Sequence, residues 1–93
     1  MNPWKVVLAP TAAATVRALP PDVKRSVRAA LDAIAKDPSM GKELLRELKG
    51  LRSYRVRRYR VVYALVPGKH LVQVVAVGHR VSIYEEIAAG RDG

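Results

Sequence analysis

The sequence has 93 residues, with 17 Lys or Arg against 8 Asp or Glu, which gives a formal net charge of +9 at pH 7. This length allows one domain, spanning residues 1–93, with one modest core. The absence of cysteine excludes a disulfide framework and a thiolate metal site.

A short strand and a helical hairpin are predicted for the first part of the chain. Residues 4–9 have the β-branched character of a strand. Thr11 is expected to cap a helix over residues 12–19, which the Pro-Pro pair after it ends. A second helix is expected over residues 22–36, because its apolar residues repeat at intervals of three and four. The resulting apolar stripe must cover a sheet.

Three strands are predicted for the second part of the chain. Residues 42–48 are expected to form either a helical turn or an irregular apolar segment. The three strands that follow are expected over residues 52–57, 59–66 and 71–78. A helical turn is expected within residues 82–89, and residues 90–93 are expected to be frayed.

Positive charge is concentrated in this second part. Residues 48–84 contain eight Lys or Arg and no Asp or Glu, so this segment carries +8 of the net charge. Because the charge follows a strand pattern and not an amphipathic helix, we expect a nucleic acid as the partner, and no membrane surface. No signal-peptide pattern opens the chain, and no apolar run approaches the ~20 residues of a membrane span. We therefore expect a cytoplasmic protein.

The first hairpin is predicted to turn about Arg57 and Arg58, which places Arg55 opposite Arg60. Like charges opposed in this way are destabilising by up to roughly 1 kcal/mol. A phosphate held between the two guanidinium groups would explain the pair. The alternative is that both arginines point into water. Arg57 and Arg58, at the tip, are expected to be solvated.

The second hairpin is predicted to have a three-residue loop, residues 67–69. Arg60 then faces Ala76, and Arg80 lies on the same face, whereas a four-residue loop would send Arg80 to the other face. The shorter loop is favoured because small residues then form the floor of a basic groove. The residues that face the helices as core are Tyr59, Val61 and Tyr63.

Other types of site are not supported. Strand alternation turns His79 away from the groove, and His70 is expected to be solvated in a turn. Two isolated histidines do not make a metal site, so we expect no metal and no cofactor. Glu85 and Glu86 are adjacent in sequence and point apart, which argues against glycosidase or protease chemistry.

A set of short motifs in the second part occurs together in one known family. The motifs are Leu48-Lys49-Gly50-Leu51, Tyr54-Arg55-Val56, Tyr59-Arg60-Val61-Val62-Tyr63 and Val77-Gly78-His79-Arg80, with Tyr84 shortly after. Together with the Leu-Pro-Pro before the second helix, they make residues 4–86 resemble the RelE/ParE superfamily of bacterial toxin–antitoxin toxins. The resemblance implies an α+β fold of order βααβββ, in which an N-terminal strand and a helical hairpin pack on a small, mostly antiparallel sheet.

The resemblance implies one of two activities. RelE-like members cleave mRNA on the ribosome without a metal, whereas ParE-like members poison DNA gyrase. By position, Arg60, Arg80 and Tyr84 match the arginine, arginine and tyrosine of the RelE-type site, and Arg55 or Arg57 would replace its lysines. The first hairpin departs from the family, because it is short and carries Arg57 and Arg58 where many relatives have Gly-Asp.

We therefore expect a RelE-like toxin that acts as a ribosome-dependent endoribonuclease, an mRNA interferase that arrests translation. Arg60, Arg80 and Tyr84 are the expected catalytic residues, with Tyr84 as the base because nearby positive charge favours its phenolate form. An anchor for the C-terminal tail is the other interpretation of Tyr84. The expected RNA-binding residues are Lys49, Arg52, Arg55, Arg57 and Arg58. The expected partners are the ribosome, mRNA and an acidic antitoxin.

Two alternatives remain open from the sequence. One is a ParE-like, non-enzymatic inhibitor of DNA gyrase, in which the same arginines bind a protein. The other is an inactive basic module that binds RNA with a steep salt dependence but cleaves nothing.

Overall fold

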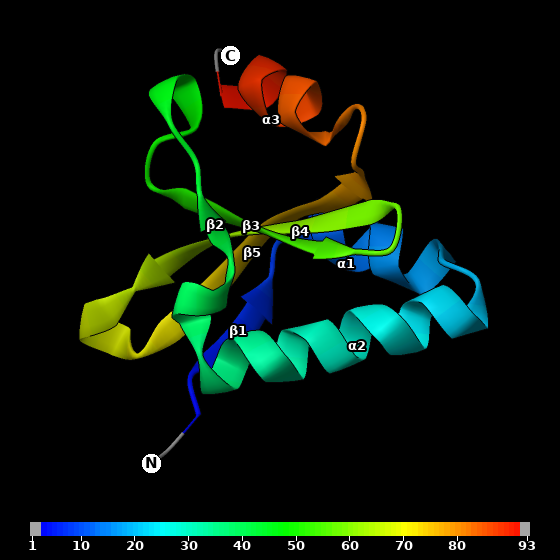
Figure 1. Ribbon diagram of the computed structural model, residues 1–93, viewed down its shortest axis with the longest axis horizontal. Coiled ribbons are helices and arrows are strands. Elements are labelled where there is room, and N and C mark those ends of the chain that lie inside the picture. Colours follow the sequence, from blue (N-terminus) through cyan, green and yellow to red (C-terminus); the bar gives the residue numbers. More distant parts are fainter. Residues whose placement is uncertain (1–2, 92–93) are drawn as a thin grey trace.

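The computed structural model describes residues 3–91 of the chain. The helices and strands follow in the order β1 (Lys5–Leu8), α1 (Pro10–Ala18), α2 (Pro21–Lys36), β2 (Lys42–Glu43), β3 (Leu51–Val56), β4 (Tyr59–Val66), β5 (Leu71–His79) and α3 (Ile83–Arg91). Three 3₁₀ turns lie between them, at Pro38–Met40, Arg46–Leu48 and Pro67–Lys69. Figure 1 shows their arrangement.

The five strands form one sheet in the order β1-β5-β4-β3-β2. β1 runs parallel to β5, and the other neighbours are antiparallel. This arrangement confirms the predicted α+β fold with a mostly antiparallel sheet. The short edge strand β2 was not predicted, because two residues are too few to show a period of two.

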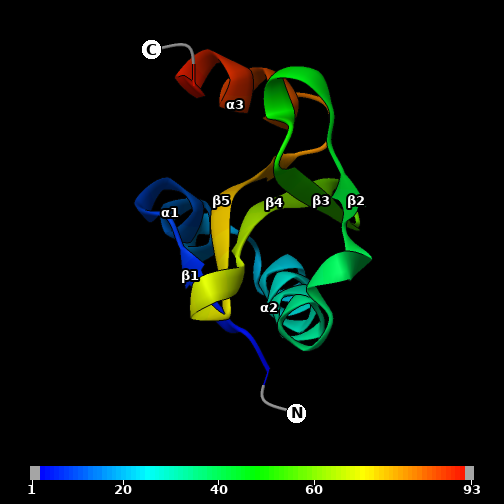
Figure 2. The same ribbon diagram turned by 90° about the vertical axis from the view of Figure 1, so that its left-hand side faces the viewer.

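Helices cover both faces of the sheet (Figure 2). α1 and α2 pack on one face, and α3 lies over the other. The predicted bounds of the three longest strands agree with the structure to within one residue. α3 includes Gly90 and Arg91, which we expected to be frayed, while residues 92–93 lie outside the described part of the chain.

The beginning of α1 differs from the prediction. The helix starts at Pro10, and Thr11 lies within its first turn, so Thr11 is not the capping residue. α2 likewise starts at a proline, Pro21. Proline suits the first helical position because it lacks the N–H that would remain unpaired there, and its fixed φ is already helical.

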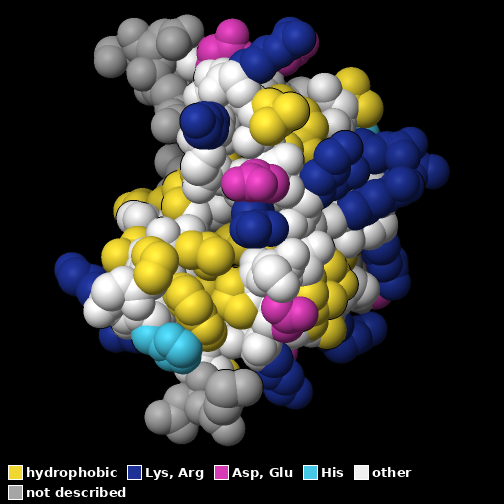
Figure 3. Space-filling view, turned by 60° about the vertical axis from the view of Figure 1, so that its left-hand side comes forward, with side chains coloured by type: hydrophobic (Ala, Val, Ile, Leu, Met, Phe, Trp, Pro, Cys, Tyr) yellow, Lys and Arg dark blue, Asp and Glu magenta, His cyan; other side chains and the backbone are white. Residues whose placement is uncertain are grey.

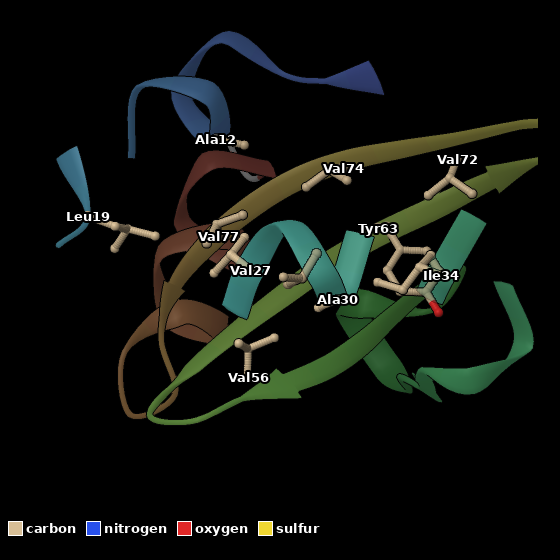
Figure 4. Close-up of a cluster of buried hydrophobic side chains, with 11 residues drawn as sticks. Ala12, Leu19, Val27, Ala30, Ile34, Val56, Tyr63, Val72, Val74 and Val77 are labelled. Atoms are coloured by element: carbon tan, nitrogen blue, oxygen red, sulfur yellow. The ribbon is translucent and has the colours of Figure 1, made fainter. Parts of the chain in front are cut away.

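The main core lies between the sheet and the α1–α2 hairpin (Figure 4). Val61 and Tyr63 are fully buried in it and Tyr59 packs against it, which confirms the predicted inward-facing residues. The Tyr63 hydroxyl donates to the carbonyl of Pro38 at 2.6 Å and accepts from the N–H of Gly41 at 2.9 Å. These bonds attach the segment after α2 to the sheet. Burial raises the pKa of Tyr63 above its ordinary value.

A second, smaller core lies under α3. Its buried residues are Leu51, Val62 and Ile83. Val62 belongs to it although its neighbour Val61 belongs to the main core, because successive strand residues point to opposite faces. The second core fixes α3 over the face of the sheet that α1 and α2 leave uncovered.

The first hairpin has the predicted register, with Arg55 paired to Arg60. In the second hairpin, four residues, 67–70, connect the strands instead of three. A β-bulge then leaves Val75 without a partner, and Arg60 pairs with Gly78 and not with Ala76. The longer loop and the bulge each shift the alternation of side chains by one residue. Their effects cancel, so Gly78 still lies on the same face as Arg60.

Among residues 3–91, no helix has the length and apolar character required to cross a membrane.

Candidate functional site

The candidate site lies on the face of the sheet that α3 covers. Ser53 and Arg55 reach this face from β3, and Arg60 reaches it from β4, because all three belong to one set of alternating positions. Tyr84 reaches it from the first turn of α3. Its neighbour Ile83, which is only 2% exposed, anchors that turn in the second core.

The Ser53 hydroxyl joins two of the predicted catalytic residues. The Tyr84 hydroxyl donates to Ser53 Oγ at 2.9 Å, and Nη1 of Arg60 donates to the same oxygen at 3.2 Å. Ser53 is itself 2% exposed, whereas Arg60 and Tyr84 are partly exposed. The structure thus brings Arg60 and Tyr84 together through a residue that the sequence analysis did not single out.

Gly78 allows α3 to approach the sheet at this point. A side chain on Gly78 would meet the Ile83 side chain, with its Cβ 2.5 Å from Cδ1 of Ile83. Since real Cβ atoms do not come this close, a larger residue at this position would require the end of the Ile83 side chain to shift. Gly78, opposite Arg60, thus leaves room for the Ile83 side chain on the sheet.

The opposed arginines turn toward different acceptors. Nε of Arg55 donates to the carbonyl of Arg57 at 3.1 Å, whereas Arg60 turns toward Ser53. Arg55 is exposed and Arg60 is partly buried. Divergence of the two side chains reduces the repulsion that the register would otherwise impose.

The tip of the first hairpin is more constrained than predicted. Arg57 has a φ of 55° and forms an ion pair with Asp22 of α2, with 3.0 Å between Nη1 and Oδ2. This bond holds the pKa of Asp22 below its ordinary value. Arg57 is thus not simply solvated, although half of its side chain remains exposed. Arg58 is exposed as predicted, and its carbonyl accepts from the N–H of Arg80 at 2.8 Å.

Arg80 therefore lies beside the tip of the first hairpin, and it is exposed to solvent. Lys49 is also exposed, in the turn that precedes β3. Arg52 differs from the other predicted RNA-binding residues, because it lies on the opposite face of the sheet from Arg55. Its Nη1 donates to the carbonyls of Gly41 at 2.8 Å and Ser39 at 3.3 Å. The structure thus uses this guanidinium to hold the segment before β2.

The two histidines lie outside the group formed by Arg60, Ser53 and Tyr84. His79 packs edge to face against Tyr59, with ring centroids 6.0 Å apart, on the face that α1 and α2 cover. This confirms that it turns away from the groove. His70 is exposed in the loop before β5, as predicted, and its ring also stacks on that of Trp4, with centroids 4.5 Å apart. Within residues 3–91, no three His, Cys, Asp or Glu side chains are grouped so as to hold a metal ion.

Positive charge dominates one side of the molecule. Figure 3 shows Lys and Arg side chains gathered densely along one edge, with few Asp or Glu side chains among them. A surface of this kind attracts polyanions and accelerates their association.

Comparison with known proteins assigns this chain to a family. Residues 6–84 match the family described as "ParE toxin of type II toxin-antitoxin system, parDE". Toxin RelE of Mycobacterium tuberculosis is 33% identical over 85 residues, which cover 89% of this chain and 88% of that relative. The chain belongs to the RelE/ParE superfamily of type II toxins. It is a RelE-like toxin of a type II toxin–antitoxin system.

Solved structures agree with this assignment of the toxin. A RelBE toxin–antitoxin complex from Mycobacterium tuberculosis matches with a TM-score of 0.78 and 32% identity, over 86% of this chain and 94% of that one. A mutant of the E. coli toxin RelE in the free state matches with a TM-score of 0.77 and 23% identity, over 96% and 97% of the two chains. At that identity the second match shows the fold alone. The family and fold expected from the motifs are confirmed.

Proposed function

We propose that this toxin is a ribosome-dependent endoribonuclease that cleaves mRNA without a metal ion and so arrests translation. The observation that carries the proposal is the hydrogen-bonded group of Arg60, Ser53 and Tyr84 on a basic face of the sheet. Cleavage of a phosphodiester requires a base for the 2′-hydroxyl and positive charge to stabilise the phosphorane, and Tyr84 and Arg60 can provide these.

In the proposed reaction the phenolate of Tyr84 takes the proton of the 2′-hydroxyl. The 2′-oxygen forms a bond to phosphorus, and the bond from phosphorus to the 5′-oxygen breaks. Water supplies the proton for the leaving 5′-oxygen, and the hydroxide that remains takes up the proton that Tyr84 accepted, which regenerates the phenolate. The products are a 2′,3′-cyclic phosphate and a free 5′-hydroxyl.

Arg60 and Arg80 stabilise the charge of the phosphorane in this proposal. A guanidinium group has five N–H donors, of which Arg60 uses one on Ser53, so the others are left for phosphate oxygens. Arg80 lies beside the hairpin tip, because its backbone N–H donates to the carbonyl of Arg58. Arginine stays charged at any physiological pH, so these contacts do not depend on the state of the base.

The exposed basic residues around this group would hold the RNA backbone. They are Lys49, Arg55 and Arg58, together with Arg57, whose side chain is half exposed although it pairs with Asp22 of α2. Arg52 is left out of the proposed surface because its guanidinium is occupied by backbone carbonyls on the other face. The ribosome would orient the mRNA relative to these residues. Because this proposed substrate is in the cytoplasm, the toxin would act there.

An antitoxin is the third partner in the proposal. The RelBE structures that match this chain are toxin–antitoxin complexes. An acidic, partly disordered antitoxin would neutralise the basic face by wrapping it. The sheet also has an open edge at β1, where Val7 is 41% exposed, and an extended segment of the antitoxin can pair there.

Primer extension on a reporter mRNA, after brief induction of the toxin in cells, tests the proposal. The wild type should produce new 5′ ends within the message only while it is translated. Tyr84→Phe and Arg80→Ala should each abolish these ends and relieve growth arrest. The matched control is Arg25→Ala, which removes one exposed positive charge from α2 and should cleave like the wild type. Intact mRNA with arrested growth and a DNA-damage response would contradict the proposal and indicate gyrase as the target.

A further inference from the structure

We infer that Ser53 is a positioning residue that sets the distance and orientation between Arg60 and Tyr84. The inference rests on the proposed function, because it concerns the same reaction. Among residues 3–91, the side chains of Arg60 and Tyr84 each make one hydrogen bond within the protein, and both bonds end at Ser53 Oγ.

The bonds of Ser53 distinguish it from a serine that only supports the fold. It is 2% exposed, and its strand neighbour across the sheet is the fully buried Val62. A hydroxyl in such a place costs free energy to desolvate. Within the part of the chain that the structure describes, the Ser53 hydroxyl bonds to no backbone group, because its two partners are the side chains of Arg60 and Tyr84. Its use is therefore to place these two side chains.

One hydroxyl suits this task because it can both accept and donate. An sp³ oxygen has two lone pairs, and here both accept, one from each partner. When Tyr84 gives up its proton, the Ser53 hydroxyl can rotate and donate to the phenolate while Arg60 keeps its bond. Ser53 thus holds the tyrosine in both of its protonation states, which alanine cannot do.

The positioning has a direct consequence for catalysis. Without the Ser53 hydroxyl, the side chains of Tyr84 and Arg60 are held in place only by packing against their neighbours. Loss of orientation at a reacting centre costs up to about 100-fold in rate even when the reacting groups remain. The loss should appear in the chemical step more than in binding, because the basic residues at the hairpin tip are unchanged.

Single-turnover cleavage of ribosome-bound mRNA by purified toxin tests the inference, with Ser53→Ala, Tyr84→Phe and the double variant. Ser53→Ala should lower the rate constant at saturating toxin by about 10- to 100-fold, and leave the half-saturating toxin concentration within about twofold. The double variant should lose much less than the product of the two single losses, because the part of the Ser53 effect that acts through Tyr84 is already gone and only the bond to Arg60 remains to be lost. Ser53→Thr, which keeps the hydroxyl, should recover part of the rate.

Two further variants separate positioning from folding. Ser53→Cys keeps the shape of the side chain but replaces the hydroxyl by a slightly larger thiol, which is a weak acceptor, so it should be slow while its thermal midpoint stays close to that of the wild type. Ser26→Ala, on α2, removes another serine hydroxyl and should cleave normally.

The results that would overturn the inference are a Ser53→Ala or Ser53→Cys toxin that cleaves at the wild-type rate, or a double variant whose loss is the product of the two single losses. If wild-type toxin leaves ribosome-bound mRNA intact, the proposed function fails, and this inference fails with it.

Discussion

Two buried hydroxyl groups have different roles in this toxin. That of Tyr63 bonds to backbone groups of Pro38 and Gly41 and holds the chain after α2 against the sheet. That of Ser53 bonds only to side chains of the candidate site. The sequence placed Tyr63 in the core through its spacing from Tyr59. It could not single out Ser53, because a serine within a strand looks like many others until Tyr84, 31 residues later, is folded over it.

Tyr63→Phe should lower the free energy of unfolding by about 1–3 kcal/mol at pH 7, because the N–H of Gly41 then loses its partner in a buried place. The pH dependence should change as well. The folded pKa of Tyr63 is raised, so its neutral form stabilises the wild type fully below the ordinary pKa of about 10, and this contribution is lost as the pH rises through the folded pKa.

Urea unfolding of both proteins at pH 8 and at pH 10.5 measures these two effects. The stability difference between wild type and Tyr63→Phe should be smaller at the higher pH. A difference that is unchanged or larger at pH 10.5 would show that the tyrosine is not held in its neutral form.

At the scale of elements, the two hairpins show what a sequence pattern can predict. The register of the first hairpin followed from its symmetry about Arg57 and Arg58 and is confirmed. The predicted register of the second hairpin was wrong by two residues at Arg60. The loop has four residues and not three, and the bulge at Val75 was not predicted. A run of valines has no feature that marks the one left unpaired, so sequence reasoning had no signal for it.

The turn of the first hairpin carries strain that the sequence suggested. It lacks the glycine or asparagine typical of such turns, and Arg57 adopts a left-handed φ of 55°. This conformation costs an ordinary residue roughly 1 kcal/mol or more. The ion pair with Asp22 is exposed and offsets little of that cost. We propose that an arginine stands at this strained position because it contacts RNA.

Arg57→Asn should therefore stabilise the fold while weakening cleavage. In an Asp22→Asn background, where the ion pair is already absent, the change should raise the free energy of unfolding by about 0.5–1 kcal/mol, because asparagine tolerates a left-handed φ. Chemical denaturation of the single and double variants checks this, and cleavage by the single variant should fall severalfold. A lower free energy of unfolding in the double variant would mean that the turn is not strained.

In the whole molecule, the two faces of the sheet have different roles. The face under α1 and α2 carries the main core, whereas the face under α3 carries the smaller core and the candidate site. The sequence predicted the main core through the helical stripe and a basic opposite face through the arginines on strands. It predicted an open groove over Ala76 and Gly78 on that face, which was wrong, because Ile83 of α3 packs there. It missed the edge strand β2 and the bonds that hold Arg52 on the far face, since both depend on segments brought together only by the fold.

Cleavage of a defined mRNA by purified toxin, in the presence and absence of ribosomes, tests the proposed activity directly. We expect cuts only in the ribosome-bound message, with 2′,3′-cyclic phosphate ends, and none with Tyr84→Phe. An intact message on the ribosome, together with inhibition of purified DNA gyrase by the same toxin, would contradict it. Arg60, Arg80 and Tyr84 would then be residues of a protein-binding surface.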